Sequence, residues 1–144
     1  LIIICNHKNN PYFDKLKRLT NFERDKRVKF VGTVYDRDLL NYIRENAFAY
    51  IHGHEVGGTN PGLLEALGHT KLNLVLNIDF NKSVAGASAF YWNKTSGNLS
   101  CLINDADCHY DFTEYGNRAR AIVKQNYTWE KIVGEYEELF LNEN

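Results

Sequence analysis

The 144-residue sequence is poor in several residue types, and each scarcity excludes a class of protein. It contains no methionine, two prolines and three cysteines. The odd number of cysteines (Cys5, Cys101 and Cys108) argues against a secreted disulfide framework and favours reduced thiols in a cytoplasm. No apolar run reaches the roughly 18 to 20 residues of a membrane span. The opening Leu-Ile-Ile-Ile also lacks the basic leader of a signal peptide. We therefore expect a cytoplasmic protein without a membrane span.

An excess of charge of one sign is also lacking. Seventeen Lys and Arg residues against eighteen Asp and Glu residues give a formal net charge of −1. Neither a nucleic-acid-binding surface nor an acidic tail is indicated. The densest positive cluster, Lys15, Lys17 and Arg18, is interpreted as a solvated helix face. The length is that of one domain with a real core. Because the first strand-like run has no initiator Met, we expect an excised domain that lacks its first elements.

Short apolar runs alternate with helical patterns, which is typical of βα units around a parallel sheet. The spacing predicts helices from Tyr12, from Asp36 as an N-cap, from Pro61 to about residue 68, over 115–123, and from Thr128 as an N-cap. The first strand is expected to be buried on both faces. The fold class is therefore α/β, a Rossmann-like, doubly wound parallel sheet in one domain. The predicted strands cover residues 1–5, 28–31, 47–51, 73–77 and 89–92.

The segment that follows the third predicted strand combines residues suited to binding an anion. In an open parallel sheet, ligands lie outside the carboxyl ends of the strands. Gly57 and Gly58 can adopt positive φ and allow the backbone to approach a phosphate. Asn60 is a favoured N-cap, and Pro61 suits the first helical position. The start of this helix directs free amides and the positive end of its dipole at the loop. The segment therefore predicts a diphosphate site.

Glu65 lies about one turn into the same helix. There its carboxylate can accept paired hydrogen bonds from a ribose diol while phosphates rest on the helix start. The alternative is a solvent-facing residue that only complements the helix dipole. The residue types alone leave both interpretations open.

A small cluster of His52, His54 and Glu55 precedes the glycines. These side chains could form hydrogen bonds to a sugar or phosphate, or orient the glycine loop. They could also begin a metal site, with His69 or His109 as distant partners, but no recognised ligand spacing is present. We expect no metal.

Three stretches carry a resemblance to a known family. Residues 27–40 read Arg-Val-Lys-Phe-Val-Gly-Thr-Val-Tyr-Asp-Arg-Asp-Leu-Leu, and residues 47–54 read Ala-Phe-Ala-Tyr-Ile-His-Gly-His. Residues 57–67 read Gly-Gly-Thr-Asn-Pro-Gly-Leu-Leu-Glu-Ala-Leu. Together they resemble the C-terminal domain of family 4 glycosyltransferases, which have the two-domain GT-B fold. The His-Gly-His and Gly-Gly-Thr-Asn-Pro motifs are similar to those of the bacterial rhamnosyltransferase branch, which builds capsular and cell-wall polysaccharides. Residues 127–140 resemble the terminal helix of the family, so the resemblance covers nearly the whole chain.

The resemblance implies roles for individual residues. Glu65 matches the second glutamate of the E-x7-E motif, which holds the nucleotide ribose. Glu55 departs from the motif, because it lies ten positions before Glu65 and Gly57 occupies the eight-back position. Lys8 is a weak candidate for the cations that neutralise the diphosphate. The resemblance places Gly57, Gly58, Thr59 and Asn60, with His54 and Glu55 beside them, at the diphosphate and donor sugar, and Gly32, Thr33 and Tyr35 near the nucleobase.

The resemblance also implies an activity for a full-length enzyme. It would transfer a hexose or deoxyhexose from a sugar nucleotide with retained configuration, without a cofactor, through electrostatic stabilisation of the leaving diphosphate. We favour dTDP-rhamnose as donor, with UDP-sugars and GDP-mannose open; no catalytic residue is identified. The acceptor, a saccharide or lipid-linked saccharide, requires an N-terminal domain that is absent here. We therefore expect the fragment to be inactive alone. The full-length enzyme could also attach peripherally to the inner face of the membrane.

Three other functions stay open at this point. One is a sugar-nucleotide epimerase of the same fold, which needs its own acid and base carboxylates. The second is a non-catalytic nucleotide- or phosphate-binding module, which needs no carboxylate at the sugar. The third is a metal-dependent hydrolase built on His52, His54 and Glu55.

Overall fold

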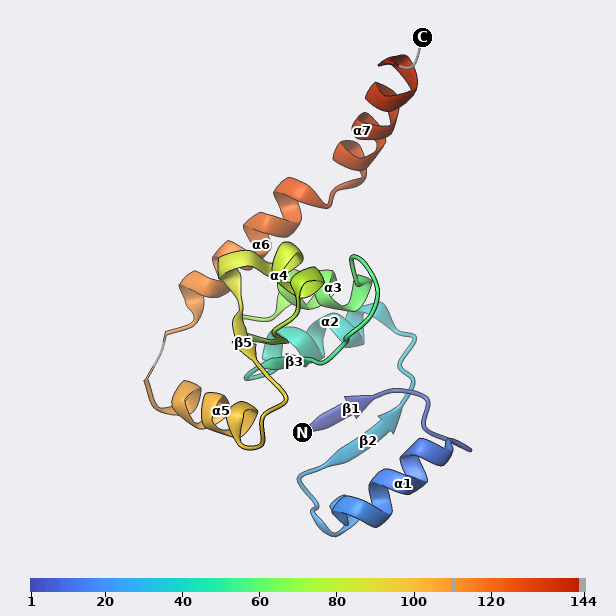
Figure 1. Ribbon diagram of the computed structural model, residues 1–144, viewed down its shortest axis with the longest axis vertical. Helices are drawn as coiled ribbons and strands as arrows, with labels where there is room; N and C mark the ends of the chain where they lie inside the picture. The colour runs from blue at the N-terminus through green and yellow to red at the C-terminus, as the bar shows by residue number, and fades with distance from the viewer. Residues whose placement is uncertain (110, 143–144) are drawn as a thin grey trace. The chain divides into compact units, whose positions relative to one another are not determined.

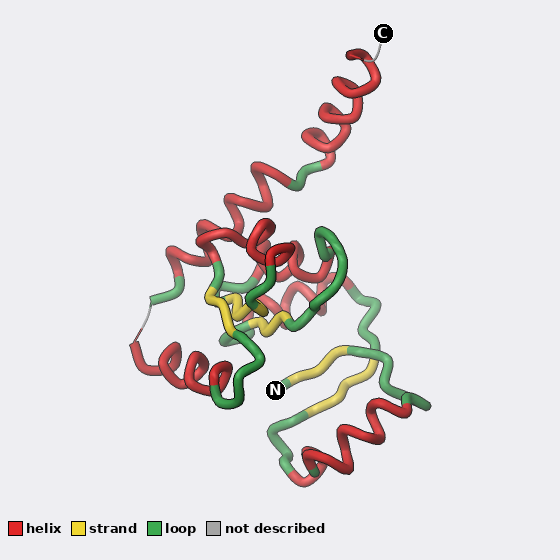
Figure 2. Tube along the Cα trace, viewed as in Figure 1, coloured by secondary structure: helices red, strands yellow, loops and turns green. Residues whose placement is uncertain are grey.

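The computed structural model describes residues 1–109 and 111–142, and the chain divides into two compact units, Leu1–Leu40 and Asn41–Asn144. In both units parallel strands alternate with helices along the chain (Figures 1 and 2). The predicted α/β fold class, with parallel strands in a Rossmann-like arrangement, is confirmed. The sequence predicted one sheet, whereas the described strands form two, β1-β2 and β3-β4-β5.

The first unit is a two-stranded parallel sheet with one helix. Strand β1 (Ile2–Ile4) pairs with β2 (Lys29–Gly32), and between them lie helix α1 (Pro11–Thr20) and the 3-10 helix η1 (Phe22–Arg24). Phe13 of α1 packs on Phe30 of β2 with ring centroids 4.8 Å apart, and Phe22 lies equally close to Phe30. The expectation that β1 is buried on both faces is wrong, because Ile2 is 53% exposed. A two-stranded sheet with a single helix cannot cover both of its faces.

Helix α2 (Arg37–Asn46) contains the boundary between the two units. It begins as the sequence predicted, because the Asp36 carboxylate accepts hydrogen bonds from the N–H groups of Asp38 and Leu39 at 2.9 and 3.0 Å. An Asx cap of this kind satisfies amides that have no partner inside the helix.

The second unit contains the longer sheet. Its strands β3 (Tyr50–His52), β4 (Asn73–Leu76) and β5 (Phe90–Trp92) are all parallel and lie in sequence order. Each begins or ends within three residues of the predicted strand. The helical elements of the unit, besides the end of α2, are α3 (Pro61–His69), α4 (Asp79–Ala85), the 3-10 helix η2 (Gly86–Ser88), α5 (Asn98–His109), α6 (Thr113–Asn126) and α7 (Trp129–Asn142).

Helices cover both faces of this sheet because the side chains of β4 alternate between two cores. Val75 points to one face and packs in a buried cluster with Leu63 and Leu67 of α3 and Ala119 of α6. Leu74 points to the opposite face and packs with the α5 side of the unit. The strand is fully buried, as expected for a central parallel strand. The doubly wound arrangement is therefore present in this unit.

Helix α7 begins where the sequence predicted. Thr128 caps it, with Oγ1 accepting from the Lys131 N–H at 3.3 Å. None of its residues is buried, and Trp129 is 81% exposed.

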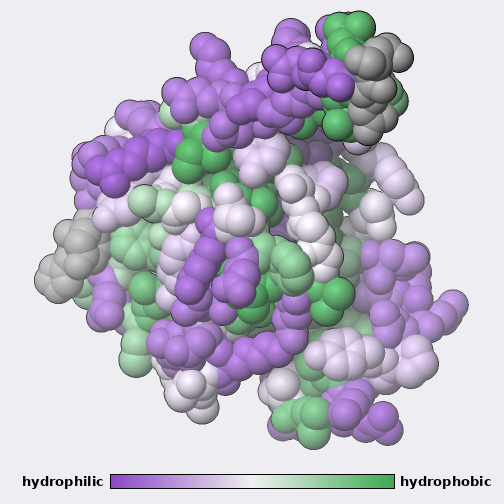
Figure 3. All heavy atoms as spheres, turned by 45° about the horizontal axis from the view of Figure 1, so that its top comes forward, coloured by the Kyte–Doolittle hydropathy of each residue, from purple (hydrophilic) through white to green (hydrophobic). Residues whose placement is uncertain are grey.

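Figure 3 draws hydrophilic and hydrophobic side chains interspersed over one face of the molecule. Within residues 1–109 and 111–142, no helix is long and apolar enough to cross a membrane.

Candidate functional site

The side chains of Tyr50 and His52 on β3 and of His54 just after it form a row of rings. Residues i, i+2 and i+4 of an extended chain share a face. The ring of His52 stacks between those of Tyr50, at a centroid distance of 6.0 Å, and His54, at 5.1 Å. Ile51, which has the opposite orientation, packs in the α5 core. The row leads from inside the sheet to its carboxyl edge, where the loop 53–60 begins.

His52 is the most constrained member of this row. It is 2% exposed, and its Nδ1 lies 3.5 Å from the hydroxyl oxygen of Tyr50. Its Nε2 has no hydrogen-bond partner among the described residues. Burial lowers the pKa of His52 to about 4, and the neighbouring His54 contributes to the same shift. The imidazole is therefore neutral at pH 7. Burial also raises the pKa of the Tyr50 phenol.

Of the two adjacent glycines in the loop after β3, only one has positive φ. Gly57 has φ +121°, a conformation that residues with a side chain rarely adopt. Gly58 does not have positive φ, although both glycines have open space where a Cβ would stand. Residues 53–59 are exposed. The prediction of a glycine-dependent turn is confirmed at Gly57 and not at Gly58.

The start of α3 has the geometry that the sequence predicted. Asn60 is the N-cap, with φ −91° and ψ 120°, and its side-chain oxygen accepts from the Leu63 N–H at 3.3 Å. Pro61 follows at the first helical position. A Cβ at Gly62 would stand 3.1 Å from Asn60 Oδ1 and 3.6 Å from the Tyr50 hydroxyl. The small residue therefore lets the phenol, the cap and the first turn of the helix lie close together.

Glu65 forms an ion pair that the sequence did not reveal. Its Oε2 accepts a hydrogen bond from Nη2 of Arg44, near the end of α2, at 2.6 Å. The Arg44 side chain is 15% exposed and that of Glu65 is 46% exposed. Glu65 is thus more than a solvent-facing helix residue. The ribose contact itself stays a prediction.

Two further residues that sequence reasoning missed lie around the same loop. Lys94, just after β5, forms an ion pair with Glu55, and both side chains are exposed. Asn81 of α4 donates from Nδ2 to the carbonyl of His54 at 3.1 Å and to that of Leu76 at 3.0 Å. The amide therefore ties the start of the loop to the end of β4. No local pattern signals either contact, because the partners are distant in sequence.

The structure gives the metal interpretation no support. The described part of the chain has no group of three or more His, Cys, Asp or Glu side chains that could hold a metal ion. His69 is instead hydrogen-bonded through Nδ1 to Glu45 Oε1 at 2.9 Å. The side chain of His109 lies outside the described residues.

The residues assigned to the nucleobase belong to the other unit. Gly32 ends β2 with φ +78°, and Tyr35 is 89% exposed. Thr33 is exposed between them, and Lys8 also lies in this unit. The roles of these residues toward a nucleotide stay predictions.

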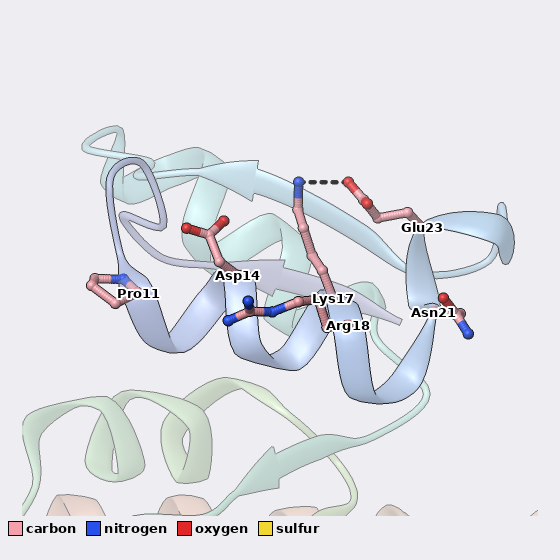
Figure 4. A pocket seen from close by; sticks show the side chains of 6 residues that line it. All are labelled: Pro11, Asp14, Lys17, Arg18, Asn21 and Glu23. Carbon is pink, nitrogen blue, oxygen red and sulfur yellow. Dashed lines mark ion pairs between the residues drawn. The ribbon is translucent and has the colours of Figure 1, made fainter.

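An open surface hollow lies on α1 of the first unit, and it is not the site that the sequence predicted. Lys17 and Glu23 face each other across it in an ion pair of 2.7 Å (Figure 4). Lys17 also lies 4.9 Å above the ring of Phe13. These contacts fit the interpretation of the basic cluster as a helix face. The hollow is lined by Pro11, Asp14, Lys17, Arg18, Asn21 and Glu23.

Comparison with known proteins identifies a structural neighbour. The fold is similar to that of a glycosyltransferase from Rickettsia africae, with a TM-score of 0.75 and 15% sequence identity. The match covers 96% of this chain and 38% of the neighbour, so the chain spans well under half the length of that protein. No family model matches the sequence, and no curated protein matches it. The likeness therefore establishes the fold, a parallel α/β arrangement also present in a glycosyltransferase.

Proposed function

We propose that the chain is the donor-binding half of a glycosyltransferase that uses a sugar nucleotide. The observation that carries the proposal is the start of α3 at the carboxyl edge of the parallel sheet. There a glycine with positive φ, the Asn60 cap and the first turn of the helix adjoin one exposed loop. Loops at this edge are where open α/β sheets bind ligands, and helix starts attract phosphate. The fold shared with a glycosyltransferase supports the same proposal.

The enzyme of which this chain is the donor half is proposed to be a retaining, rhamnosyltransferase-like member of family 4 with the GT-B fold. Its donor is dTDP-rhamnose, and its pathway is bacterial cell-surface polysaccharide synthesis in the cytoplasm. The acceptor, a saccharide or lipid-linked saccharide, is held by a further domain. This assignment rests on the resemblance of the His-Gly-His and Gly-Gly-Thr-Asn-Pro motifs to that branch of the family. We expect this chain to bind donor and to transfer no sugar by itself.

Electrostatic stabilisation of the leaving group accounts for the chemistry. As the bond between the anomeric carbon and the diphosphate oxygen breaks, negative charge grows on the diphosphate. An acceptor hydroxyl oxygen bonds to the same face of that carbon, and its proton passes to the departing diphosphate. Preorganised amides and a helix start stabilise that charge without reorganising. The proposal places Gly57, Gly58, Thr59 and Asn60 at the diphosphate, His54 and Glu55 at the sugar, and Glu65 at the ribose. Lys94 contacts this loop through its ion pair with Glu55.

The test is a thermal-shift panel of dTDP-rhamnose, UDP-glucose and GDP-mannose on the chain. A donor at one hundred times its Kd stabilises by about 2.7 kcal/mol, which raises the melting temperature by roughly 5 to 10 °C. We expect dTDP-rhamnose to give the largest rise. Failure of all three to raise it at millimolar concentration would remove the donor-site proposal.

The two loop glycines provide a matched pair of variants. Gly57→Ala places a Cβ on a backbone at φ +121°, with a strain of about 1 to 3 kcal/mol. Gly58→Ala is the matched control, because Gly58 does not have positive φ and a Cβ there also meets open space. By calorimetry we expect Gly57→Ala to weaken dTDP binding about tenfold and Gly58→Ala to weaken it less. Equal affinity in the wild type and Gly57→Ala would contradict a backbone contact to the diphosphate.

A variant of Glu65 distinguishes the proposed donor site from a module that binds phosphate alone. If its carboxylate holds the sugar of the nucleotide, Glu65→Ala weakens dTDP binding about tenfold or more, because a charged hydrogen bond is lost. Binding of inorganic phosphate to the loop stays unchanged. Undiminished dTDP affinity would favour the module.

A further inference from the structure

The ion pair of Arg44 with Glu65 bears on which nucleotide sugar the site accepts. One oxygen of the carboxylate, Oε2, already accepts from the guanidinium at 2.6 Å. The backbone of Arg44 is anchored in turn, since its carbonyl accepts from Oγ1 of Thr70, a buried residue, at 3.1 Å. Its side chain is largely shielded from solvent at 15% exposure. The pairing is therefore a built part of the site and not a loose surface contact.

Discrimination between ribose and 2′-deoxyribose depends on what happens when the 2′-hydroxyl is missing. A site built to bond a hydroxyl rejects the analogue without it because a polar group is then left unpaired. Here the missing hydroxyl leaves Glu65 with one oxygen on Arg44 and the other for the remaining 3′-hydroxyl. Both carboxylate oxygens thus keep a hydrogen-bond donor when the 2′-hydroxyl is absent, so little binding free energy is lost.

We infer that Arg44 is a specificity-determining residue: by occupying one oxygen of Glu65, it lets the donor site accept a 2′-deoxyribonucleoside diphosphate nearly as well as its ribo counterpart. This inference rests on the proposed role of Glu65 at the sugar of the nucleotide. Arg44 positions the carboxylate and does not itself contact the reacting atoms.

The test compares thymidine diphosphate with ribothymidine diphosphate, which differ only in the 2′-hydroxyl, by calorimetry on the whole chain. For the wild type we expect dissociation constants within about threefold of each other. In Arg44→Met the freed oxygen can accept from the 2′-hydroxyl, which only the ribo form supplies, so we expect a preference for the ribo form of about tenfold. Arg44→Lys retains a charged donor and should restore most of the wild-type ratio.

The two dissociation constants are compared within one variant. Partial unfolding of Arg44→Met would weaken the binding of both nucleotides by the same factor, so it leaves their ratio unchanged. Arg118→Met is the matched control, since Arg118 forms an exposed ion pair with Glu114 on α6; it should leave the ratio at the wild-type value.

Two outcomes overturn the inference while leaving the donor site intact. One is a wild type that prefers ribothymidine diphosphate tenfold or more. The other is an Arg44→Met variant whose ratio equals that of the wild type. If the wild type binds neither nucleotide, the proposed function fails, and the inference fails with it. The wild-type binding measurement therefore distinguishes the two failures.

Discussion

Acid should destabilise the second unit through one buried side chain, His52. The folded state holds the pKa of this imidazole at about 4, against an ordinary value of 6.5, because burial disfavours the charged form and His54 adds to the effect. In the unfolded chain the ring is solvated and titrates near 6.5. Between these two values the unfolded chain binds a proton that the folded chain does not.

The sign and size of the effect follow from that difference. Stability falls as the pH falls from about 6.5 to about 4, and the contribution of His52 is constant outside this window. Each unit of pKa difference corresponds to about 1.4 kcal/mol, so the full window corresponds to about 3 kcal/mol. Between pH 7.5 and pH 4.5 we expect His52 to account for a loss of about 2 to 3 kcal/mol.

The measurement is urea unfolding at those two pH values, followed by tryptophan fluorescence. Replacing the exposed Trp129 with Phe leaves Trp92, whose Nε1 donates to the Leu74 carbonyl at 3.2 Å inside the unit, as the one reporter. The variant His52→Phe keeps the stacked ring and removes the proton site. It leaves no broken hydrogen bond at Nε2, which has no partner among the residues described.

We expect His52→Phe to lose about 2 to 3 kcal/mol less than the wild type between pH 7.5 and pH 4.5. His54→Gln serves as the matched variant: it removes the smaller cause of the shift and leaves burial, so it should keep most of the pH dependence. The reasoning is refuted if the wild type and His52→Phe lose the same stability. A nuclear magnetic resonance titration that places the His52 pKa at 6 or above would refute it as well.

The remaining predictions concern the helices that build the site. Asn60→Ala removes the cap of α3 and should destabilise the unit by about 1 kcal/mol in urea unfolding, whereas Asn60→Asp should be nearly neutral; an Ala variant as stable as the wild type would contradict the cap. Gly116→Ala places a Cβ 2.9 Å from the backbone Cα of Lys71, so we expect a loss of about 1 to 3 kcal/mol. Gly68→Ala, on α3 with open space, should instead stabilise by about 0.5 to 1 kcal/mol; the same sign for both glycine variants would contradict the steric reasoning.

The parts of the site that could be predicted are those whose geometry is local in sequence. The caps at Asp36, Asn60 and Thr128 each depend on a side chain and an amide two or three residues away, so residue type and position suffice. The turn at Gly57 has the same local origin, although sequence could not tell which of the two glycines adopts positive φ.

The parts that could not be predicted depend on tertiary placement. Arg44 and Glu65 lie 21 residues apart, and only the tertiary fold of the second unit brings the end of α2 close enough to α3 for them to meet. Helix α5 was missed because its Ser, Asn and Asp residues are poor helix formers. Its stability comes from Leu102, Ile103 and other apolar residues that pack on the sheet. The exposure of β1 could not be predicted from the sequence either. An apolar strand is buried only if another layer of the structure covers it, and the local sequence does not show whether such a layer exists.

The two groups of residues around the loop are held by different forces. The sheet and the helix packed on it hold Tyr50 and His52, whose rings are shielded from water, so changes there act first on stability. The loop around Gly57 is exposed, and side chains of Asn81 and Lys94 contact it from other elements, so changes in the loop should act first on ligand binding. Glu65 stands between the groups, because its helix is packed in the core while its carboxylate is half-exposed and oriented by a shielded arginine. For this reason the ratio of two nucleotide affinities, which is independent of folding, is the measurement that can assign its role.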